Sequence, residues 1–417
     1  MQRHDIQSAN AAGLSRRTLF SHGGAAIAGL TAAGGFQGKA FAQSGAQVIP
    51  WLDQPMAVPP GPIQLPQTLK PGFLWTVASG APEPGRVIHN LQRWEDLDSW
   101  ITPNERFFNV AHYDRPVIDP NTWSLEVTGL VEQPLKLSLA QLKALPRQET
   151  TCTIECSGNR GLPFFTSAVG NAKWSGTPLA ALLAQARPMK NGTEVVFIGA
   201  DAGEEIVRDV TILSHFARSL SLAEAMDQNT LLCYDMNGAA LPAANGFPLR
   251  LIVPDWYGVA SVKWLKRIEI QDSRFMGRFM ARDYVTVREE KRNGESYWTE
   301  TAIGRWRLAS AAARVMRQGS QYRVHGMAWG APVKGVEVQF DGGAWLPATL
   351  DTSQNAKSAW TFWSIDWPSP TPGEHTVTSR AIDASGNVQP AASDPAMTGK
   401  KTYWESNAQA TRRIRFG

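Results

Sequence analysis

The chain has 417 residues, of which 43% are hydrophobic and 19% are charged. At roughly 150 residues per domain this length predicts two to three domains, and it excludes a small disulfide-stapled scaffold. The net charge is +4 and most of it lies in the first 42 residues, so the remainder lacks the basic stripe that nucleic acids or anionic membranes require. Three cysteines are too few for a disulfide framework or a four-thiolate metal site.

Residues 1–42 have the pattern of a twin-arginine signal peptide. Ser-Arg-Arg-Thr-Leu-Phe at 15–20 precedes a weakly apolar, Gly- and Ala-rich run at 23–36, and Ala-Phe-Ala at 40–42 offers a cleavage site. This order favours a signal peptide over a mobile tail with a chance arginine pair. No other stretch approaches the roughly 18 apolar residues of a membrane span. We therefore expect a periplasmic protein without a membrane span, exported folded and able to carry a cofactor loaded in the cytoplasm.

The next two segments differ in periodicity. Residues 43–93 are rich in Pro and Gly, which predicts an extended arm. Residues 94–295 alternate between strand-like and helix-like runs, which predicts a mixed α+β domain. Its expected elements are strands at 123–127, 194–198 and 249–253 and helices at 138–145 and 177–183. Ser138 can cap the first helix, and Pro178 suits the first turn of the second.

Helical periodicity almost vanishes in residues 296–417. Alternating runs predict strands at 322–329, 336–340, 360–367 and 375–381, separated by Gly- and Asn-containing turns. Regularly spaced strands over about 100 residues predict an antiparallel immunoglobulin-like β-sandwich. Its tryptophans are most simply core or interface residues: Trp345, Trp360, Trp363 and Trp367.

The segment around residues 150–161 carries the most chemical information. Cys152 and Cys156 are four residues apart in an extended-looking stretch, where about 13 Å would separate them, so a disulfide between them is not expected. Cys233 lies in an apolar run and is expected to be a small buried hydrophobe. Cys156 is followed by Ser-Gly-Asn-Arg, a turn-forming sequence ending in a cation, Arg160. Such a thiolate could be a nucleophile or a ligand for a soft metal, and the residues leave both open.

The motif Glu-Cys-Ser-Gly-Asn-Arg at 155–160 resembles the molybdenum-binding segment of the sulfite oxidase family. Further segments in that family's order lie at 104–125, 199–201, 225–238, 245–265 and 281–284, and the C-terminal strands resemble its dimerisation domain. This resemblance covers about residues 95–400. It implies a sulfite-oxidase-type molybdopterin domain over 94–295 and a dimerisation domain over 296–417.

The resemblance also implies a set of site residues. Cys156 would supply the protein thiolate to molybdenum, Tyr284 would hydrogen-bond near the metal's oxo or water ligand, and Arg160 would be a catalytic cation for the substrate. Residues expected to hold molybdopterin are Phe108, Asn109, His112, Asp201, Asn245, Arg250, Ser261, Val262 and Lys263. The residue types suit this role, because arginine and lysine bind phosphate and the pterin ring needs directional donors and acceptors.

Three positions depart from the family pattern. Val110 and Gly161 stand where sulfite-oxidising members carry arginines, and Asn245 stands where animal members have a histidine. An unpaired buried anion costs several kcal/mol, so the first two changes weaken the case for sulfite itself. Arg160, Arg115, Arg218 or an arginine from the C-terminal domain are candidates to compensate. An amide at Asn245 can still donate and accept hydrogen bonds, so cofactor binding is expected to survive.

The leading hypothesis is therefore a periplasmic molybdopterin-dependent oxidoreductase that transfers an oxygen atom to sulfite or a related sulfur compound. The chain contains no Cys-x-x-Cys-His motif, so we expect no haem in it and electron transfer to a separate c-type cytochrome. The second domain predicts a homodimer.

Three alternatives remain open at this stage. The first is a molybdopterin-dependent reductase of neutral sulfoxide- or N-oxide-like substrates, which the missing arginines favour. The second is a non-catalytic binding protein built on the sandwich. The third is a thiol hydrolase with Cys156 as nucleophile.

Overall fold

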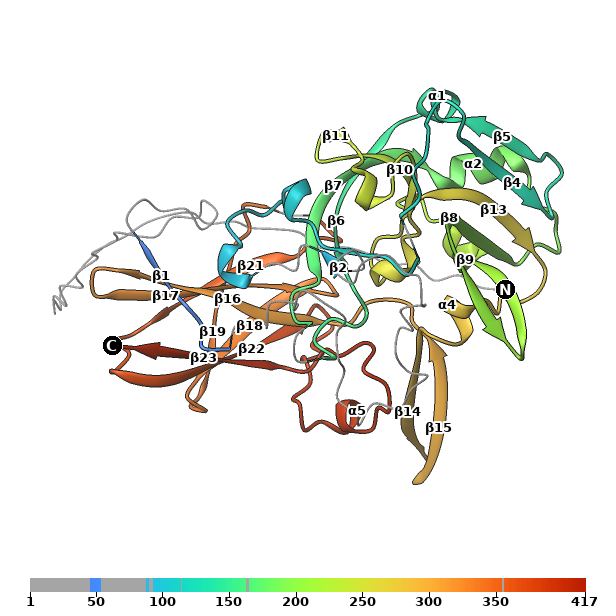
Figure 1. Cartoon of the computed structure of the whole chain (residues 1–417). Coiled ribbons are helices and arrows are strands. Elements are labelled where there is room, and N and C mark those ends of the chain that lie inside the picture. The colour runs from blue at the N-terminus through green and yellow to red at the C-terminus, as the bar shows by residue number, and fades with distance from the viewer. Residues whose placement is uncertain (1–45, 54–87, 90–92, 114, 163–164, 355) are drawn as a thin grey trace, which may run out of the picture. The chain divides into compact units, whose positions relative to one another are not determined.

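A computed structural model describes residues 46–53, 88–89, 93–113, 115–162, 165–354 and 356–417. The expected signal peptide at 1–42 and most of the arm at 43–93 lie outside the described residues. In this part of the chain strands far outnumber helices (Figure 1). The longest described helix has eight residues.

Two five-stranded sheets form the first half of the described fold. One has the order β5-β4-β13-β8-β9 and is mixed, because β13 runs parallel to β4 and antiparallel to β8. Its strands are β4 (Ser124–Gly129), β5 (Leu135–Ser138), β8 (Glu194–Val207), β9 (Val210–Ser221) and β13 (Leu265–Gln271). The other has the order β11-β10-β7-β6, with β12 also paired to β10. Its strands are β6 (Gln148–Glu155), β7 (Val169–Pro178), β10 (Leu231–Met236), β11 (Ala239–Ala240) and β12 (Arg250–Ile252).

Short helices connect these strands. They are α1 (Leu139–Lys143), α2 (Leu179–Ala186), α3 (Leu222–Ala225) and α4 (Arg278–Ala281). Ser138 caps α1 as predicted: its hydroxyl accepts from the N–H of Gln141, whose side chain accepts from the N–H of Ser138. Pro178 precedes α2 as its N-cap instead of lying in the first turn. The expected mixed α+β character is thus present in a weaker form, with sheets providing the framework and helices reduced to connections.

The second half is a sandwich of two antiparallel sheets, in the orders β1-β16-β17-β21-β20 and β19-β18-β22-β23. The first holds β1 (Gln47–Ile49), β16 (Ala309–Gln318), β17 (Gln321–Trp329), β20 (Thr349–Leu350) and β21 (Thr361–Trp367). The second holds β18 (Val333–Phe340), β19 (Trp345–Pro347), β22 (Gly373–Asp383) and β23 (Ala410–Phe416). The four strands expected in this region are therefore present. Trp363 and Trp367 lie in the shared core, Trp360 is buried in the apolar cluster that includes residues of the first two sheets, and Trp345 is half-buried.

The described part of the arm belongs to this sandwich. β1 pairs with β16, and Trp51 is buried in the core with its indole N–H donating to the Ala313 carbonyl at 2.8 Å. The chain therefore crosses from its N-terminal end to the C-terminal sandwich before it builds the first two sheets. This long-range pairing leaves no periodic signal in a segment of three strand residues.

The remaining elements are short or stand apart from the larger sheets. β14 (Val285–Arg292) and β15 (Glu295–Ala302) form a two-stranded hairpin, β2 (Ile88–His89) pairs with β3 (Asn109–Val110), and α5 (Pro395–Thr398) precedes β23. In the described part of the chain no helix has the length and apolar character needed to cross a bilayer.

Candidate functional site

A cavity that opens to solvent lies where the first two sheets meet the loops that follow β3, β6 and β12. It is lined by Phe107, Phe108, Asn109, Val110, Ala111, His112, Ile154, Cys156, Asp201, Phe216, Arg250, Gly258, Val259, Ser261, Lys263 and Tyr284. Nine of the residues expected from the sequence are in this set. They come from segments up to 176 positions apart, so only the fold brings them together.

The local backbone explains how several of them reach the cavity. Cys156 follows the last residue of β6, and its N–H donates to the Ala168 carbonyl at 2.9 Å, which fixes the start of its loop. Asp201 lies where the β8–β9 pairing shifts register, and this irregularity turns its carboxylate out of the ladder. Ser261 and Lys263 follow a 3₁₀ turn at Gly258–Ala260.

Two cations lie on one side of the cavity, of which Arg250 is buried and Lys263 is half-buried. The Lys263 ammonium donates to the Val110 carbonyl at 2.7 Å and to Asn109 Oδ1 at 3.3 Å. The Arg250 guanidinium donates to the carbonyls of Asn245 and Ser261 at 2.9 and 3.1 Å. Burial lowers the pKa of both groups, and for Lys263 the charge of Arg250 adds to the effect. Their hydrogen-bond partners are neutral, and the charge of Asp201 attracts Lys263 without a close ion pair.

Three polar atoms near these cations have no hydrogen-bond partner among the described residues. They are Asp201 Oδ1, Asn245 Nδ2 and Arg250 Nε. Each belongs to a side chain that is at least nine-tenths buried. A buried polar atom without a partner costs about 1–3 kcal/mol, so these groups fit a ligand that supplies both donors and acceptors.

His112 and Tyr284 form a hydrogen-bonded pair beside Cys156. His112 Nε2 and the Tyr284 hydroxyl are 2.6 Å apart. Burial lowers the pKa of His112 well below its ordinary value, and the charges of Lys263 and Arg278 lower it further. Burial also raises the pKa of Tyr284. His112 is therefore neutral and Tyr284 keeps its proton, which leaves a polar hydroxyl fixed at the cavity wall.

Cys156 carries its thiol into this cavity. Burial raises its pKa to about 12, the opposite of the shift that activates a cysteine nucleophile. This argues against a thiol hydrolase, whereas a bound metal ion deprotonates a coordinating thiol outright. Cys152 and Cys233 are fully buried and free, as expected for structural cysteines.

The expectation that Arg160 acts at the cavity needs correction. Its guanidinium lies 3.7 Å from Glu155 Oε1 and 5.1 Å from the ring centroid of Trp329, and it is not among the lining residues. The guanidinium therefore lies beside the Glu155 carboxylate and not at the cavity lining. Arg218, a candidate to replace it, donates to the carbonyls of Phe279 and Ile303 and also does not line the cavity.

Two other expected residues act from behind the lining. The Asn245 carbonyl accepts from Arg250, and the Val262 carbonyl accepts from the Leu251 N–H at 2.8 Å, so both support the strand that presents Arg250. The sequence also missed apolar wall residues, Phe216 and Val259, because an isolated apolar residue gives no functional signal.

Two family models match the chain: the oxidoreductase molybdopterin binding domain at residues 112–279 and the Mo-co oxidoreductase dimerisation domain at 307–407. Sulfite oxidase of Gallus gallus is 32% identical over 324 residues, which cover 70% of this chain and 69% of that protein. The chain belongs to the sulfite oxidase family. Mitochondrial sulfite oxidase of Homo sapiens is 35% identical over 323 residues, covering 70% of this chain, and the chain spans 58% of that relative's length.

This sulfite oxidase family member also resembles a solved structure. A chain of the sulfane dehydrogenase SoxCD from Paracoccus pantotrophus has a TM-score of 0.69 and 26% identity, over 86% of this chain and 92% of that chain. Together with the matched family models, this likeness supports the molybdopterin cofactor expected from the sequence. The excess cations and unpartnered polar atoms described above fit its phosphate and its pterin ring.

The structure gives a physical reason for one departure from the family pattern. A Cβ atom added to Gly161 would overlap the carbonyl oxygen and carbon of Tyr403, which are backbone atoms and cannot swing aside. No side chain, and therefore no arginine, fits at this position while residues 402–407 keep their path. Val110, at the other departure, is half-buried and lines the cavity as an apolar residue.

Proposed function

We propose that the protein is a molybdenum-dependent oxidoreductase that oxidises a reduced sulfur compound, with sulfite as the first candidate. The observation that carries this proposal is the convergence of Cys156, the His112–Tyr284 pair and the cations Arg250 and Lys263 on one cavity. Sulfite oxidases are relatives of the chain over 70% of its length, which supports the choice of substrate class.

Each group of the cavity has a defined task in this proposal. The bound molybdenum cofactor supplies oxygen-atom transfer and accepts two electrons. Cys156 provides a thiolate ligand to the metal. Arg250 and Lys263, which donate to uncharged carbonyl oxygens, neutralise the cofactor's phosphate. Tyr284 holds its proton at the hydroxyl, and neutral His112 orients that hydroxyl by accepting or donating one hydrogen bond at 2.6 Å.

A sulfane-type sulfur substrate is the second candidate. A free oxyanion in a partly closed cavity needs cationic partners, and the two family arginine positions are Val110 and Gly161 here. Tyr403 fills the space beside Gly161, so the lost cation cannot be regained by a small local adjustment. The similar chain from a sulfane dehydrogenase supports the same alternative. A reductase of neutral oxo-compounds remains the third candidate for the same reason.

The cellular setting is also part of the proposal. The twin-arginine pattern at 15–20 supports export of the folded, cofactor-loaded protein to the periplasm. There a c-type cytochrome would accept the electrons singly, because this chain lacks a covalent haem motif. The match of residues 307–407 to a dimerisation domain supports a homodimer.

The deciding experiment measures molybdenum per chain and substrate-dependent reduction of cytochrome c. We expect about one molybdenum per chain, from the single thiolate ligand, and loss of both metal and turnover in Cys156→Ser. Cys152→Ser and Cys233→Ser are the matched controls and should affect mainly stability.

The outcomes separate the candidates. Turnover with sulfite supports the first, and turnover only with a sulfane sulfur donor supports the second. Bound molybdenum with neither activity, but with oxidation of the reduced enzyme by a sulfoxide, would support the reductase. A protein without molybdenum after maturation with molybdate would contradict the proposal as a whole.

A further inference from the structure

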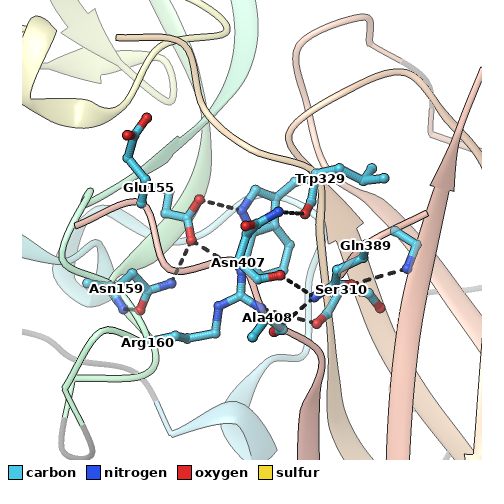
Figure 2. A network of polar contacts seen from close by, with 12 residues as sticks. Glu155, Asn159, Arg160, Ser310, Trp329, Gln389, Asn407 and Ala408 are labelled. Carbon is cyan, nitrogen blue, oxygen red and sulfur yellow. Dashed lines mark hydrogen bonds and ion pairs between the residues drawn. The ribbon is translucent and has the colours of Figure 1, made fainter. Parts of the chain in front are cut away.

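A buried carboxylate lies next to the cysteine of the cavity and has no task in the chemistry above. Glu155 is 1% exposed and is the last residue of β6, directly before Cys156. Its Oε1 accepts from Asn159 Nδ2 at 2.9 Å, and its Oε2 accepts from the indole N–H of Trp329 at 2.8 Å (Figure 2). Both carboxylate oxygens are therefore used in specific hydrogen bonds.

The Asn159 side chain connects this carboxylate to the backbone of Cys156. Asn159 Oδ1 accepts from the N–H of Ala168 at 3.0 Å, and the carbonyl of the same Ala168 accepts from the N–H of Cys156 at 2.9 Å. The Asn159 N–H in turn donates to the Cys156 carbonyl at 2.9 Å. The Glu155 carboxylate is thus connected through Asn159 and Ala168 to the backbone N–H and carbonyl of Cys156.

Trp329 belongs to the other half of the molecule. It ends β17 of the sandwich and lies 174 positions from Glu155 in the chain. The Arg160 guanidinium lies over the Trp329 ring, and its Nη1 donates to the Ser310 carbonyl at 3.4 Å (Figure 2). The sandwich therefore contacts the cysteine loop in two ways. The Trp329 indole donates to Glu155, and the Arg160 guanidinium of the loop contacts Trp329 and Ser310 of the sandwich.

A second part of the sandwich segment holds the same loop from its far side. The Glu405 N–H donates to the Ser157 carbonyl at 2.8 Å, and the Trp404 ring stacks on Tyr284 with centroids 4.4 Å apart. The backbone of Tyr403 lies against Gly161. The loop from Glu155 to Gly161 is consequently fixed at both ends by residues of the C-terminal half.

We infer that Glu155 is a positioning residue for the Cys156 thiolate, and that the sandwich fixes this thiolate through Trp329. This inference rests on the proposed role of Cys156 as the metal ligand. A metal ligand must be held in place by neighbours whose own positions are fixed by hydrogen bonds and packing, and Glu155 receives such bonds from both halves of the chain. The matched dimerisation domain thereby has a part in cofactor binding.

The test exploits the opposite hydrogen-bonding capacity of a carboxylate and an amide. Glu155→Gln leaves one acceptor oxygen for two donors, so either Asn159 or Trp329 loses its bond. Adding Asn159→Asp reverses the direction of the bond between the two side chains, and it keeps acceptors for Trp329 and Ala168. The exchange variant E155Q/N159D therefore restores every bond and also keeps the negative charge near Arg160.

Three properties of the holoprotein are measured for each variant. They are molybdenum per chain, the thiolate-to-metal charge-transfer absorption that Cys156→Ser removes, and the midpoint of thermal unfolding. E155Q and Trp329→Phe should each lower bound molybdenum about tenfold and shift the absorption of the metal that remains. E155Q/N159D should return both readouts to near the wild-type level.

The matched control is another buried carboxylate of the same domain. Glu194 accepts from Ser219 and is 3.2 Å from Arg274, and it lies away from the cavity lining. Glu194→Gln should lower the unfolding midpoint while leaving molybdenum content and absorption unchanged.

The results separate the inference from the proposed function. Wild-type protein without molybdenum would overturn both. Wild-type protein with molybdenum, but with E155Q and Trp329→Phe equal to wild type in content and absorption, would overturn only the positioning role. An exchange variant as deficient as E155Q, or a Glu194→Gln variant with the same spectral change, would also overturn it.

Discussion

The cavity and the sandwich treat buried positive charge in different ways. In the sandwich, Arg412 is 3.2 Å from the Asp53 carboxylate and donates to the Ala312 carbonyl at 3.1 Å. In the cavity, Lys263 donates to the Val110 carbonyl and to the amide oxygen of Asn109, and no carboxylate among the described residues lies within 4.0 Å of it. The sandwich cation has a carboxylate 3.2 Å away, whereas the cavity cation has only neutral hydrogen-bond acceptors and the more distant charge of Asp201.

His375 of the sandwich and His112 of the cavity differ in the charges beside them, whereas His325 of the sandwich has a lowered pKa like that of His112. In the sandwich, the Asp341 carboxylate raises the pKa of His375, whose Nδ1 lies 2.7 Å from Asp341 Oδ2. In the cavity, burial and the nearby cations lower the pKa of His112. A buried charge without a counter-charge is costly, so a fold that keeps one in a cavity gains by binding an anion there. Together with the lining of the cavity, the comparison supports an anion site beside Arg250 and Lys263.

The largest expected effect comes from removing the paired cation. Arg412→Met should lower the free energy of unfolding by about 3 kcal/mol, because it leaves Asp53 without its partner in a partly buried position. Urea unfolding measures this loss. Arg415→Met, which removes a largely exposed cation beside Glu374, is the control and should change stability by less than about 1 kcal/mol. Equal effects from the two variants would contradict the distinction drawn here.

Removing the cavity cation Lys263 should have a smaller effect on stability, of opposite sign. Lys263→Met should leave the free energy of unfolding of the cofactor-free protein unchanged or raise it by about 1 kcal/mol, because it removes a desolvated charge. The same variant, matured with molybdate, should lose bound pterin. A loss of stability as large as that of Arg412→Met would show that Lys263 is a structural cation after all.

The smallest effect is the pH dependence of the His375–Asp341 pair. A raised pKa means that the protonated histidine stabilises the fold below its unfolded pKa and that this contribution is lost as pH rises through the folded pKa. Wild type should therefore exceed His375→Gln by about 0.5 kcal/mol near pH 6, a size typical of partly exposed pairs, and the difference should vanish by about pH 8. A difference that grows with pH would reverse the assigned direction of the shift.

Local rules predicted much of the secondary structure. The capping box at Ser138, the period-two runs of the sandwich and the apolar run before Asp201 need only neighbours in the chain, and the structure contains the corresponding helix and strands. Nine cavity residues could also be named, because ordered motifs of a family mark them. Arg160 was misplaced because its spacing from Cys156 gives no information about Glu155 and Trp329, which compete for the same guanidinium.

The sequence by itself determined the class of the two halves, the family and the cysteine proposed to bind the metal, since all three depend on residue types in a fixed order. Only the tertiary structure decided which side chains face the cavity, why no side chain fits at Gly161, and which residues of the sandwich hold the cysteine loop. These depend on contacts between segments more than 100 positions apart. Such contacts are set by packing and by the pairing of buried polar groups, which no local pattern records.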